Sequence, residues 1–152
     1  MLPLWDLADI LRHKPIREIS KRVLSVRYSN EPIAMGGVRK PSLHFYTKQI
    51  ITYESYSDIG LVNLSDRLRF EVSEKWSINN NSYKDVPNTV LIVIDRKTSS
   101  YPYWKNIKKI DISSYGIYNI WRVNRKDLEE QERLLVLKGT KPNWQEIKKE
   151  KY

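Results

Sequence analysis

The sequence contains no cysteine and only two histidines, His13 and His44. The absence of cysteine excludes disulfide bonds, thiolate zinc sites, iron–sulfur clusters and cysteine nucleophiles. With only two histidines, we do not expect a histidine-built metal site or a Ser-His-Asp relay. A catalytic site would therefore have to use carboxylates, lysines, arginines or hydroxyl groups.

Long hydrophobic segments are also lacking. The longest uninterrupted apolar run, Val90–Ile94, is far shorter than the roughly 20 residues that a membrane-spanning helix needs. The first residues lack the basic and then apolar layout of a signal peptide. We therefore expect a cytoplasmic protein with no membrane partner, and the length of 152 residues suits a single domain.

Charge of one sign predominates. The chain has 27 basic and 18 acidic residues, which gives a formal charge of +9. Such an excess favours contact with polyanions, so we expect a nucleic-acid partner, DNA or RNA. The alternative is that these side chains form ordinary solvated surfaces, and assembly as a homodimer is kept open. The basic residues that we expect to contact nucleic acid are Lys14, Arg17, Lys21, Arg39, Lys40, Lys105 and Lys108.

Apolar spacing predicts helices at both ends of the chain. Residues 1–26 have apolar side chains at helical intervals, and Pro15 is expected to separate two helices there. Near the other end, Asp127 and Glu130 form a capping box for a helix that ends near Gly139. Residues 127–152 are therefore predicted to be helical, with a second short helix after Pro142.

The middle of the chain, residues 42–123, has the composition of a β-rich core. The stretch RLRFEVSEKWSI, residues 67–78, alternates apolar and charged side chains, which predicts a half-buried strand. The run Val90–Ile94 is apolar at every position, as is typical of a central strand. We predict that these two segments pair as an antiparallel hairpin, and that another strand follows Gly116.

These patterns indicate a fold class. We expect a single α+β (or mixed α/β) domain over residues 1–152, with a central mixed or antiparallel sheet. Helices from the N-terminal and C-terminal segments would flank the sheet.

Asp95 and Lys97 directly follow the aliphatic strand. Side chains alternate along a strand, so both should point to one face. A symmetric hairpin would place Glu71 opposite Asp95. Two carboxylates, with phosphate oxygens and water, form the coordination that Mg²⁺ prefers, and a nearby lysine can activate water. The pattern predicts a Mg²⁺ (or Mn²⁺) site with Asp95, Lys97 and Glu71 as catalytic residues.

The stretch VLIVIDRKTSS, residues 90–100, resembles a known family. It is similar to the strand end of the PD-(D/E)XK nuclease superfamily, in particular to the Asp-x-Lys-Thr variant of the RecB-like exonucleases, over about ten residues. The resemblance implies that Asp95 is a metal ligand, that Lys97 is the catalytic lysine, and that both end a core strand flanked by helices. The upstream Pro-Asp of the superfamily is not found, which leaves the other metal ligands open. The candidates are Asp85, Glu71, Glu74 and Asp66, with Glu18 for the glutamate that members often add from the first helix.

Two functions remain after this reasoning. The first is a metal-dependent nuclease that acts on DNA or RNA. The alternative is a non-catalytic basic module that binds nucleic acid or a protein. In that case Asp95 would accept hydrogen bonds from the backbone amides of Thr98 or Ser99 in a turn. Whether the chain is an enzyme is left open.

Overall fold

The structure is a computed structural model that describes residues 4–37, 40, 42–78 and 88–144, with the backbone alone for 4–13 and 71–78. Its elements, in chain order, are α1 Leu4–Val26, β1 Ile33–Gly36, α2 Ser42–Thr47, β2 Ile51–Glu54, α3 Asp58–Ile78, β3 Thr89–Asp95, α4 Arg96–Ser99, α5 Pro102–Lys105, β4 Ile110–Tyr115, β5 Tyr118–Asn124 and α6 Arg125–Leu137.

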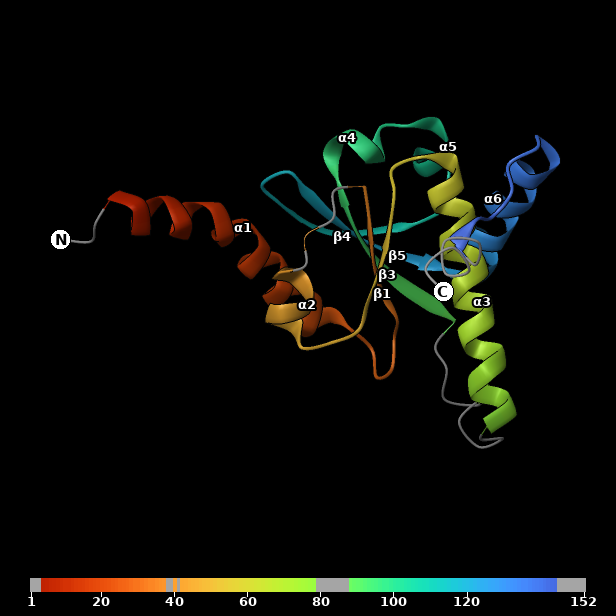
Figure 1. The fold of residues 1–152 in the computed structure, drawn as a ribbon, viewed down its shortest axis with the longest axis horizontal. Helices are drawn as coiled ribbons and strands as arrows, with labels where there is room; N and C mark the ends of the chain where they lie inside the picture. Colours follow the sequence, from red (N-terminus) through yellow and green to blue (C-terminus); the bar gives the residue numbers. More distant parts are fainter. Residues whose placement is uncertain (1–3, 38–39, 41, 79–87, 145–152) are drawn as a thin grey trace, which may run out of the picture.

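The strands form one mixed sheet with the order β2-β1-β3-β5-β4 (Figure 1). The first three strands along the chain run parallel, β5 runs antiparallel to β3, and β4 runs antiparallel to β5. β3 lies in the middle and is buried from Val90 to Asp95. The structure thus confirms the α+β fold with a mixed sheet, the central strand, and the strand after Gly116.

Helices cover both faces of the sheet, because β3 is apolar on both sides. Leu91 and Val93 face a core that also contains residues of α1 and α2. Val90, Ile92 and Ile94 face the other core, to which α3, α5 and α6 contribute. This two-sided burial explains the uninterrupted apolar run in the sequence.

The predicted strand at residues 67–78 is wrong, because this stretch belongs to helix α3. The reason lies just upstream, where Leu61, Leu64 and Leu68 are spaced by three and four residues. All three are buried in the core under α3. This helical stripe outweighs the alternation that follows it. The predicted hairpin does not form, and the neighbours of β3 are β1 and β5. The region 42–123 therefore holds four strands and also the long helix α3.

The two predicted N-terminal helices are one helix. α1 continues through Pro15, which lies inside it. Proline inside a helix removes one backbone hydrogen bond. The part of α1 that follows Pro15 is stabilised by packing. Ile16, Ile19 and Val23 are all buried against the sheet. The helical assignment of this segment was right, and the break within it was wrong.

The N-cap of the C-terminal helix α6 lies three residues earlier than predicted. The side chain of Asn124 accepts a hydrogen bond from the Lys126 amide at 3.0 Å, so Asn124 is the N-cap instead of Asp127. The helix ends at Leu137, close to Gly139 (φ 105°), as predicted. The short helix expected after Pro142 lies mostly outside the described residues.

The β4–β5 hairpin turns through two residues, Gly116 and Ile117. Tyr115 pairs with Tyr118 across this turn, and Gly116 has a φ of 60°, which glycine adopts without strain.

A buried ion pair joins the amino-terminal end of the sheet to β5. Arg122 donates from Nε and Nη2 to the two carboxylate oxygens of Glu31, each at 3.0 Å. Glu31 is 0% exposed and also accepts from the Tyr28 amide and the Thr89 hydroxyl. The guanidinium of Arg122 lies 3.8 Å from the centre of the Tyr28 ring. Glu31 raises the pKa of Arg122 chiefly through these hydrogen bonds.

Candidate functional site

The carboxyl ends of β1, β2 and β3 meet at one edge of the sheet, called the carboxyl edge below. The chain leaves β1 through α2 on one face of the sheet and leaves β2 through α3 on the other. In α/β folds, ligands bind outside the carboxyl ends where the winding reverses in this way. The carboxyl edge is therefore the first candidate site.

Asp95 lies at this reversal and caps the short helix α4. Its carboxylate accepts hydrogen bonds from the amide of Thr98 at 3.1 Å and from its hydroxyl at 2.6 Å. This is the turn predicted as the alternative to a metal site. Gly37 (φ 89°) packs against it, and a Cβ there would lie 2.1 Å from Asp95 Oδ1 and 2.2 Å from Thr98 Oγ1. Only glycine fits between the end of β1 and the turn after β3.

The structure does not bring the other predicted catalytic and metal-binding residues that it describes together with Asp95 as a metal site. Lys97 lies in α4 and is exposed. The strand partner of Asp95 is Tyr118. Burial raises the pKa of the Tyr118 hydroxyl, and the charge of Asp95 raises it by a smaller amount. Glu71 lies in α3, so its predicted pairing with Asp95 is wrong. Asp85 lies outside the described residues. Across the described part of the chain, no three or more His, Asp or Glu side chains are grouped to hold a metal ion.

The remaining acids considered as ligands are placed elsewhere. Glu18 lies 3.7 Å from Lys21 on α1. Asp66 pairs with Arg69 on α3 at 3.0 Å, and Glu74 is also in α3. Glu18 therefore lies on α1, whereas Asp66 and Glu74 lie on α3, which covers the opposite face of the sheet.

The predicted basic residues do not form one surface. Lys14, Arg17 and Lys21 are exposed on α1, which covers one face of the sheet. Lys105 and Lys108 are exposed at α5 and just after it, and α5 packs on the other face. Lys40 is exposed, and Arg39 lies outside the described residues.

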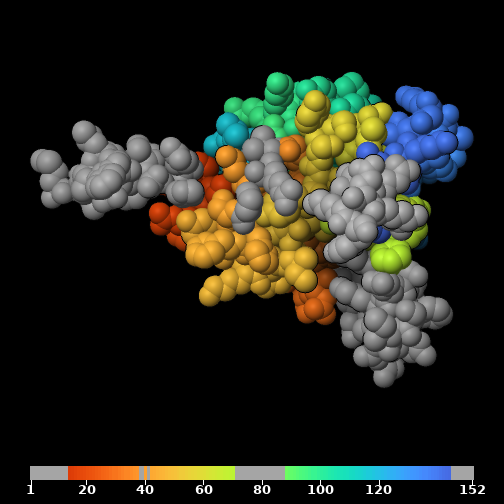
Figure 2. Space-filling model, viewed as in Figure 1, coloured from red at the N-terminus to blue at the C-terminus, as the bar shows by residue number. Residues whose placement is uncertain are grey.

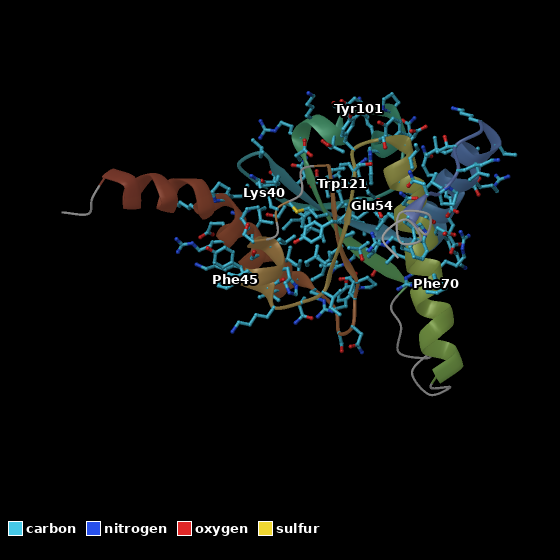
Figure 3. All side chains as sticks on the ribbon, viewed as in Figure 1. Lys40, Phe45, Glu54, Phe70, Tyr101 and Trp121 are labelled. Atoms are coloured by element: carbon cyan, nitrogen blue, oxygen red, sulfur yellow. The ribbon has the colours of Figure 1, made fainter. Side chains whose placement is uncertain are left out.

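An aromatic cluster occupies the carboxyl edge next to Asp95. Its members are Tyr56 from the β2–α3 loop and Tyr101 and Tyr103 from the segment after α4; Tyr101 is labelled in Figure 3. The rings of Tyr101 and Tyr103 stack with centroids 5.7 Å apart and planes 5° from parallel. The Tyr56 ring lies 6.0 Å from that of Tyr101, and Tyr56 is 57% exposed. Tyr56 is thus exposed to solvent beside the stacked rings of Tyr101 and Tyr103.

Trp104 fixes this cluster to the sheet. It is fully buried, and its ring packs against Gly36, where a Cβ would lie 3.3 Å away. Its indole Nε1 donates to the carbonyl oxygen of Tyr56 at 2.9 Å, and the Tyr103 hydroxyl donates to the same oxygen at 3.0 Å. Burial raises the pKa of the Tyr103 hydroxyl further above its ordinary value. Two hydrogen bonds therefore hold the backbone at Tyr56.

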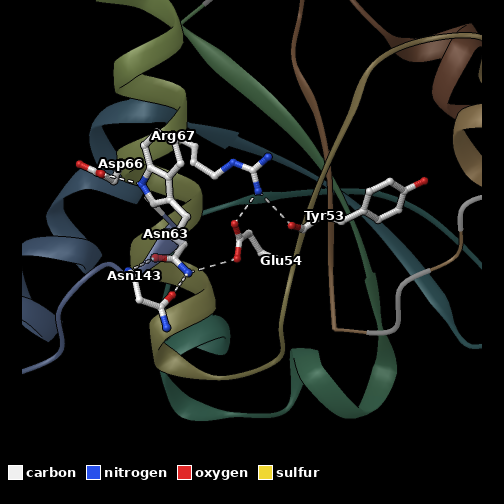
Figure 4. A network of polar contacts seen from close by, with 7 residues as sticks. Tyr53, Glu54, Asn63, Asp66, Arg67 and Asn143 are labelled. Carbon is white, nitrogen blue, oxygen red and sulfur yellow. Dashed lines mark hydrogen bonds and ion pairs between the residues drawn. The ribbon is translucent and has the colours of Figure 1, made fainter. Parts of the chain in front are cut away.

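Glu54, at the end of β2, is the centre of a polar network (Figure 4). Arg67 donates to its carboxylate at 2.7 Å and Asn63 at 3.4 Å. Burial raises the pKa of Glu54, while the hydrogen bond from Arg67 acts in the opposite direction. Asn63 also exchanges two hydrogen bonds of 2.8 Å with Asn143. The network joins the end of β2, helix α3 and the C-terminal segment.

Two more contacts hold the C-terminal segment on α3. The Thr140 hydroxyl donates to Asp58 at 2.9 Å, and the Trp144 indole donates to Asp66 at 2.8 Å. Asp58 is the first residue of α3, directly after the loop that carries Tyr56. The β2–α3 loop is therefore supported from both of its neighbours, α5 and the C-terminal segment.

The family of the chain follows from a comparison with protein-family models. Residues 26–139 match the family described as cyanobacterial RgtA-type glycosyltransferase, C-terminal domain. The chain belongs to this family. The matched region runs from the end of α1 to just past α6 and so includes the whole sheet and the carboxyl edge. No curated protein and no solved structure gives a significant match.

This match corrects the functional predictions. The resemblance to PD-(D/E)XK nucleases is wrong, and so is the prediction of a nuclease or hydrolase, because the family is one of glycosyltransferase domains. The nucleic-acid-binding alternative and the expectation of a nucleic-acid partner with no membrane are overturned by the same match. Mg²⁺ or Mn²⁺ was expected only for a nuclease, and whether the chain binds a cofactor stays a prediction. Cytoplasmic location and homodimer formation stay predictions.

One structural finding bears on membranes. Within residues 4–37, 40, 42–78 and 88–144, none of the helices combines the length and the apolar composition that crossing a bilayer requires.

Sequence reasoning missed Tyr56, the most exposed member of the aromatic cluster. A usable signal was present in the stretch ITYESYSDIG, where β-branched residues are followed by serines and an aspartate. Ser57 accepts a hydrogen bond from the Gly60 amide at 3.3 Å, as helix-starting serines do. A strand followed by a helix start would have placed Tyr56 at the carboxyl end of a strand.

Proposed function

We propose that this chain is the saccharide-binding domain of a glycosyltransferase and that it binds sugar at the carboxyl edge. The observation that carries the proposal is the Tyr56 ring, exposed at the edge where α/β folds bind ligands. A pyranose ring presents C–H bonds with partial positive charge on one face, and the face of an aromatic ring is negative. A sugar can therefore stack on Tyr56.

The site is rigid, which favours binding. The carbonyl oxygen of Tyr56 accepts from both Trp104 and Tyr103. Gly60 packs below the same loop, with a Cβ position only 2.2 Å from the Ser55 carbonyl oxygen. Because the loop is held before a ligand arrives, little conformational entropy is lost on binding.

Polar groups for the hydroxyls of a sugar stand beside Tyr56. The hydroxyls of Ser55 and Ser57 lie 2.9 Å apart, and Asp58 follows in the chain. Hydroxyls both donate and accept, and a carboxylate accepts, so together they match the mixed hydrogen-bonding of a sugar ring. An aromatic face with a few convergent polar groups suits a saccharide better than an apolar ligand.

The family supports the role. A domain that holds a growing glycan near a transferase centre raises the local concentration of the acceptor there, without taking part in the transfer step. The proposal is thus binding and positioning of an acceptor saccharide.

The proposal predicts the effect of one substitution. Tyr56→Ala should weaken saccharide binding roughly tenfold or more, the equivalent of about 1.4 kcal/mol, because the stacking surface is lost. We would screen the domain on an array of neutral and acidic oligosaccharides. The best binder would then be titrated by calorimetry into the wild type and the variant.

Tyr28→Ala is the matched control. Tyr28 is 56% exposed, almost the same as Tyr56, but it lies before β1 at the opposite end of the sheet. It should leave binding unchanged in a folded protein, as judged by circular dichroism. Binding of no oligosaccharide, or equal losses in the two variants, would overturn the proposal.

A further inference from the structure

Two large apolar side chains are almost fully exposed around α2. Phe45 is 72% exposed and Ile50 is 85% exposed. Both belong to a well-held segment: His44 Nδ1 lies 2.5 Å from the Gln49 carbonyl oxygen, and the Lys48 amide donates to the His44 carbonyl oxygen at 2.8 Å. Their exposure therefore results from a defined turn. Figure 3 labels Phe45 on the outer side of α2.

A row of cations lies beside these side chains. Lys14, Arg17 and Lys21 are spaced by three, four and seven residues, which places them on one stripe of α1. The guanidinium of Arg17 lies 6.0 Å from the centre of the Tyr46 ring in α2, so the stripe faces α2. Among the described residues, the stripe makes one ion pair with an acid, that of Lys21 with Glu18 at 3.7 Å.

The α1–α2 face is made of exposed side chains from α1, from α2, which packs on α1, and from the turn after α2. They are Lys14, Arg17, Lys21, Phe45, Lys48 and Ile50. Figure 2 shows the orange and yellow residues of α2 and the turn after it on the open surface, next to the described part of α1 in red. The sequence from Lys40 to Ile50 contains no acidic residue. The face therefore combines two protruding apolar groups with cations.

We propose that the α1–α2 face docks on the surface of a bilayer that contains anionic phospholipid. Amphipathic surfaces bind there when apolar side chains enter the boundary between head groups and acyl chains while lysines and arginines remain at the phosphates. Phe45 and Ile50 supply the inserting groups. Lys14, Arg17, Lys21 and Lys48 supply charge complementary to the lipid phosphates.

The choice of a lipid surface rests on this arrangement of charge around apolar groups. A protein partner would normally cover such side chains with a packed apolar core and few charges. Here cations with long, flexible side chains border the apolar pair, and they can extend toward the head groups. The α1–α2 face shares no residue with the carboxyl edge, so this proposal and the saccharide proposal stand or fall separately.

The first test is co-sedimentation of the domain with vesicles of phosphatidylcholine, with and without phosphatidylglycerol. Binding should need phosphatidylglycerol and should weaken with salt, because salt screens the charges. Each cation near an anionic bilayer contributes a factor of about five. The triple variant Lys14→Gln, Arg17→Gln, Lys21→Gln should therefore bind about a hundredfold more weakly, whereas the matched triple Lys105→Gln, Lys108→Gln, Lys138→Gln should bind like the wild type.

The second test measures insertion directly and uses the absence of cysteine from the chain. Ile50→Cys introduces a single thiol that can carry an environment-sensitive fluorophore. Its emission should shift to the blue when phosphatidylglycerol vesicles are added. The control is Leu137→Cys at the end of α6, a site that is 73% exposed and lies outside the α1–α2 face.

The outcomes separate the possibilities. A blue shift at residue 50 alone, with loss of binding in the α1 triple variant, supports the proposal. No vesicle binding, equal shifts at residues 50 and 137, or equal losses in the two triple variants would each overturn it. Wild-type saccharide binding by the α1 triple variant would show that the carboxyl edge is intact.

Discussion

Glu31→Ala should lower the free energy of unfolding by about 3–5 kcal/mol, because it leaves the Arg122 charge without its partner in a buried place. Glu31 is 0% exposed, and the side chain of Arg122 is 11% exposed. The change also removes the acceptor for the Tyr28 amide and the Thr89 hydroxyl. Since small domains are stable by only about 5–15 kcal/mol, the loss would be a large share of the total. Urea unfolding followed by circular dichroism measures it.

An exposed ion pair of the same chemistry is the control. Glu130 and Arg133 approach to 2.5 Å, closer than Glu31 and Arg122, but their side chains are 57% and 61% exposed. Glu130→Ala should therefore give no measurable change in the unfolding midpoint. The comparison shows whether burial or the distance between the charged atoms determines how much an ion pair contributes to stability.

A double variant completes this test. Glu31→Gln with Arg122→Met removes both charges, so it should be less destabilising than the sum of the two single changes. Equal midpoints for Glu31→Ala and the wild type, or strict additivity in the double variant, would contradict the role assigned to the buried pair.

Gly37→Ala should cost about 2–4 kcal/mol, from backbone strain and from loss of the hydrogen bonds around Asp95. The φ of 89° disfavours any side chain, and the new Cβ would lie 2.1 Å from Asp95 Oδ1. The carboxylate would have to move, and with it the cap on the Thr98 amide. Urea unfolding gives the loss, and amide chemical shifts of residues 95–100 should report the displaced turn.

Gly139→Ala isolates the backbone contribution. Gly139 has a similar φ of 105°, but a Cβ there would meet nothing within 4 Å. It should cost only about 1 kcal/mol. A background with Asp95→Ala and Thr98→Ala removes the two oxygens that lie 2.1 and 2.2 Å from the new Cβ and leaves only the Thr98 Cβ, at 3.0 Å. Gly37→Ala should cost clearly less there than in the wild type. If Gly37→Ala and Gly139→Ala cost the same in the wild-type background, the close packing of Gly37 has no energetic role.

The central strand could be predicted from sequence because its burial is two-sided and local. Val90–Ile94 is apolar at each position, is shorter than an ordinary helix and consists mostly of β-branched residues, which together favour a covered strand. Local patterns also indicated the strand after Gly116 and the helices α1 and α6. In these segments local pattern and tertiary contacts agree.

Helix α3 was missed because two periodicities meet in it. Leu61, Leu64 and Leu68 follow helical spacing, whereas the residues after Leu68 alternate as a strand would. The first half of α3 packs in the core, so its pattern decides the structure of the whole segment. The antiparallel pairing of Glu71 with Asp95, and the metal site built on it, depended on that one choice.

The chemistry of Asp95 was ambiguous in sequence for a different reason. An acid that ends a strand can bind a metal or cap a turn, and the residues Asp-x-x-Thr permit both. The structure supplies the missing contact, which is the close approach of Gly37 from another strand. Tyr56 and Tyr101 likewise meet only through tertiary packing, so no spacing in the sequence could indicate their cluster.

The order of strands has a consequence for how fast parts of the sheet assemble. The β4–β5 hairpin closes through Gly116 and Ile117, and hairpins of this kind form in about 1–10 μs. The parallel pairing of β1 with β3 joins residues as distant as Ile33 and Leu91 and must wait for α2, β2 and α3 to be enclosed. We therefore expect the antiparallel half of the sheet to be structured early in folding and the carboxyl edge, which needs all three parallel strands, to be completed last.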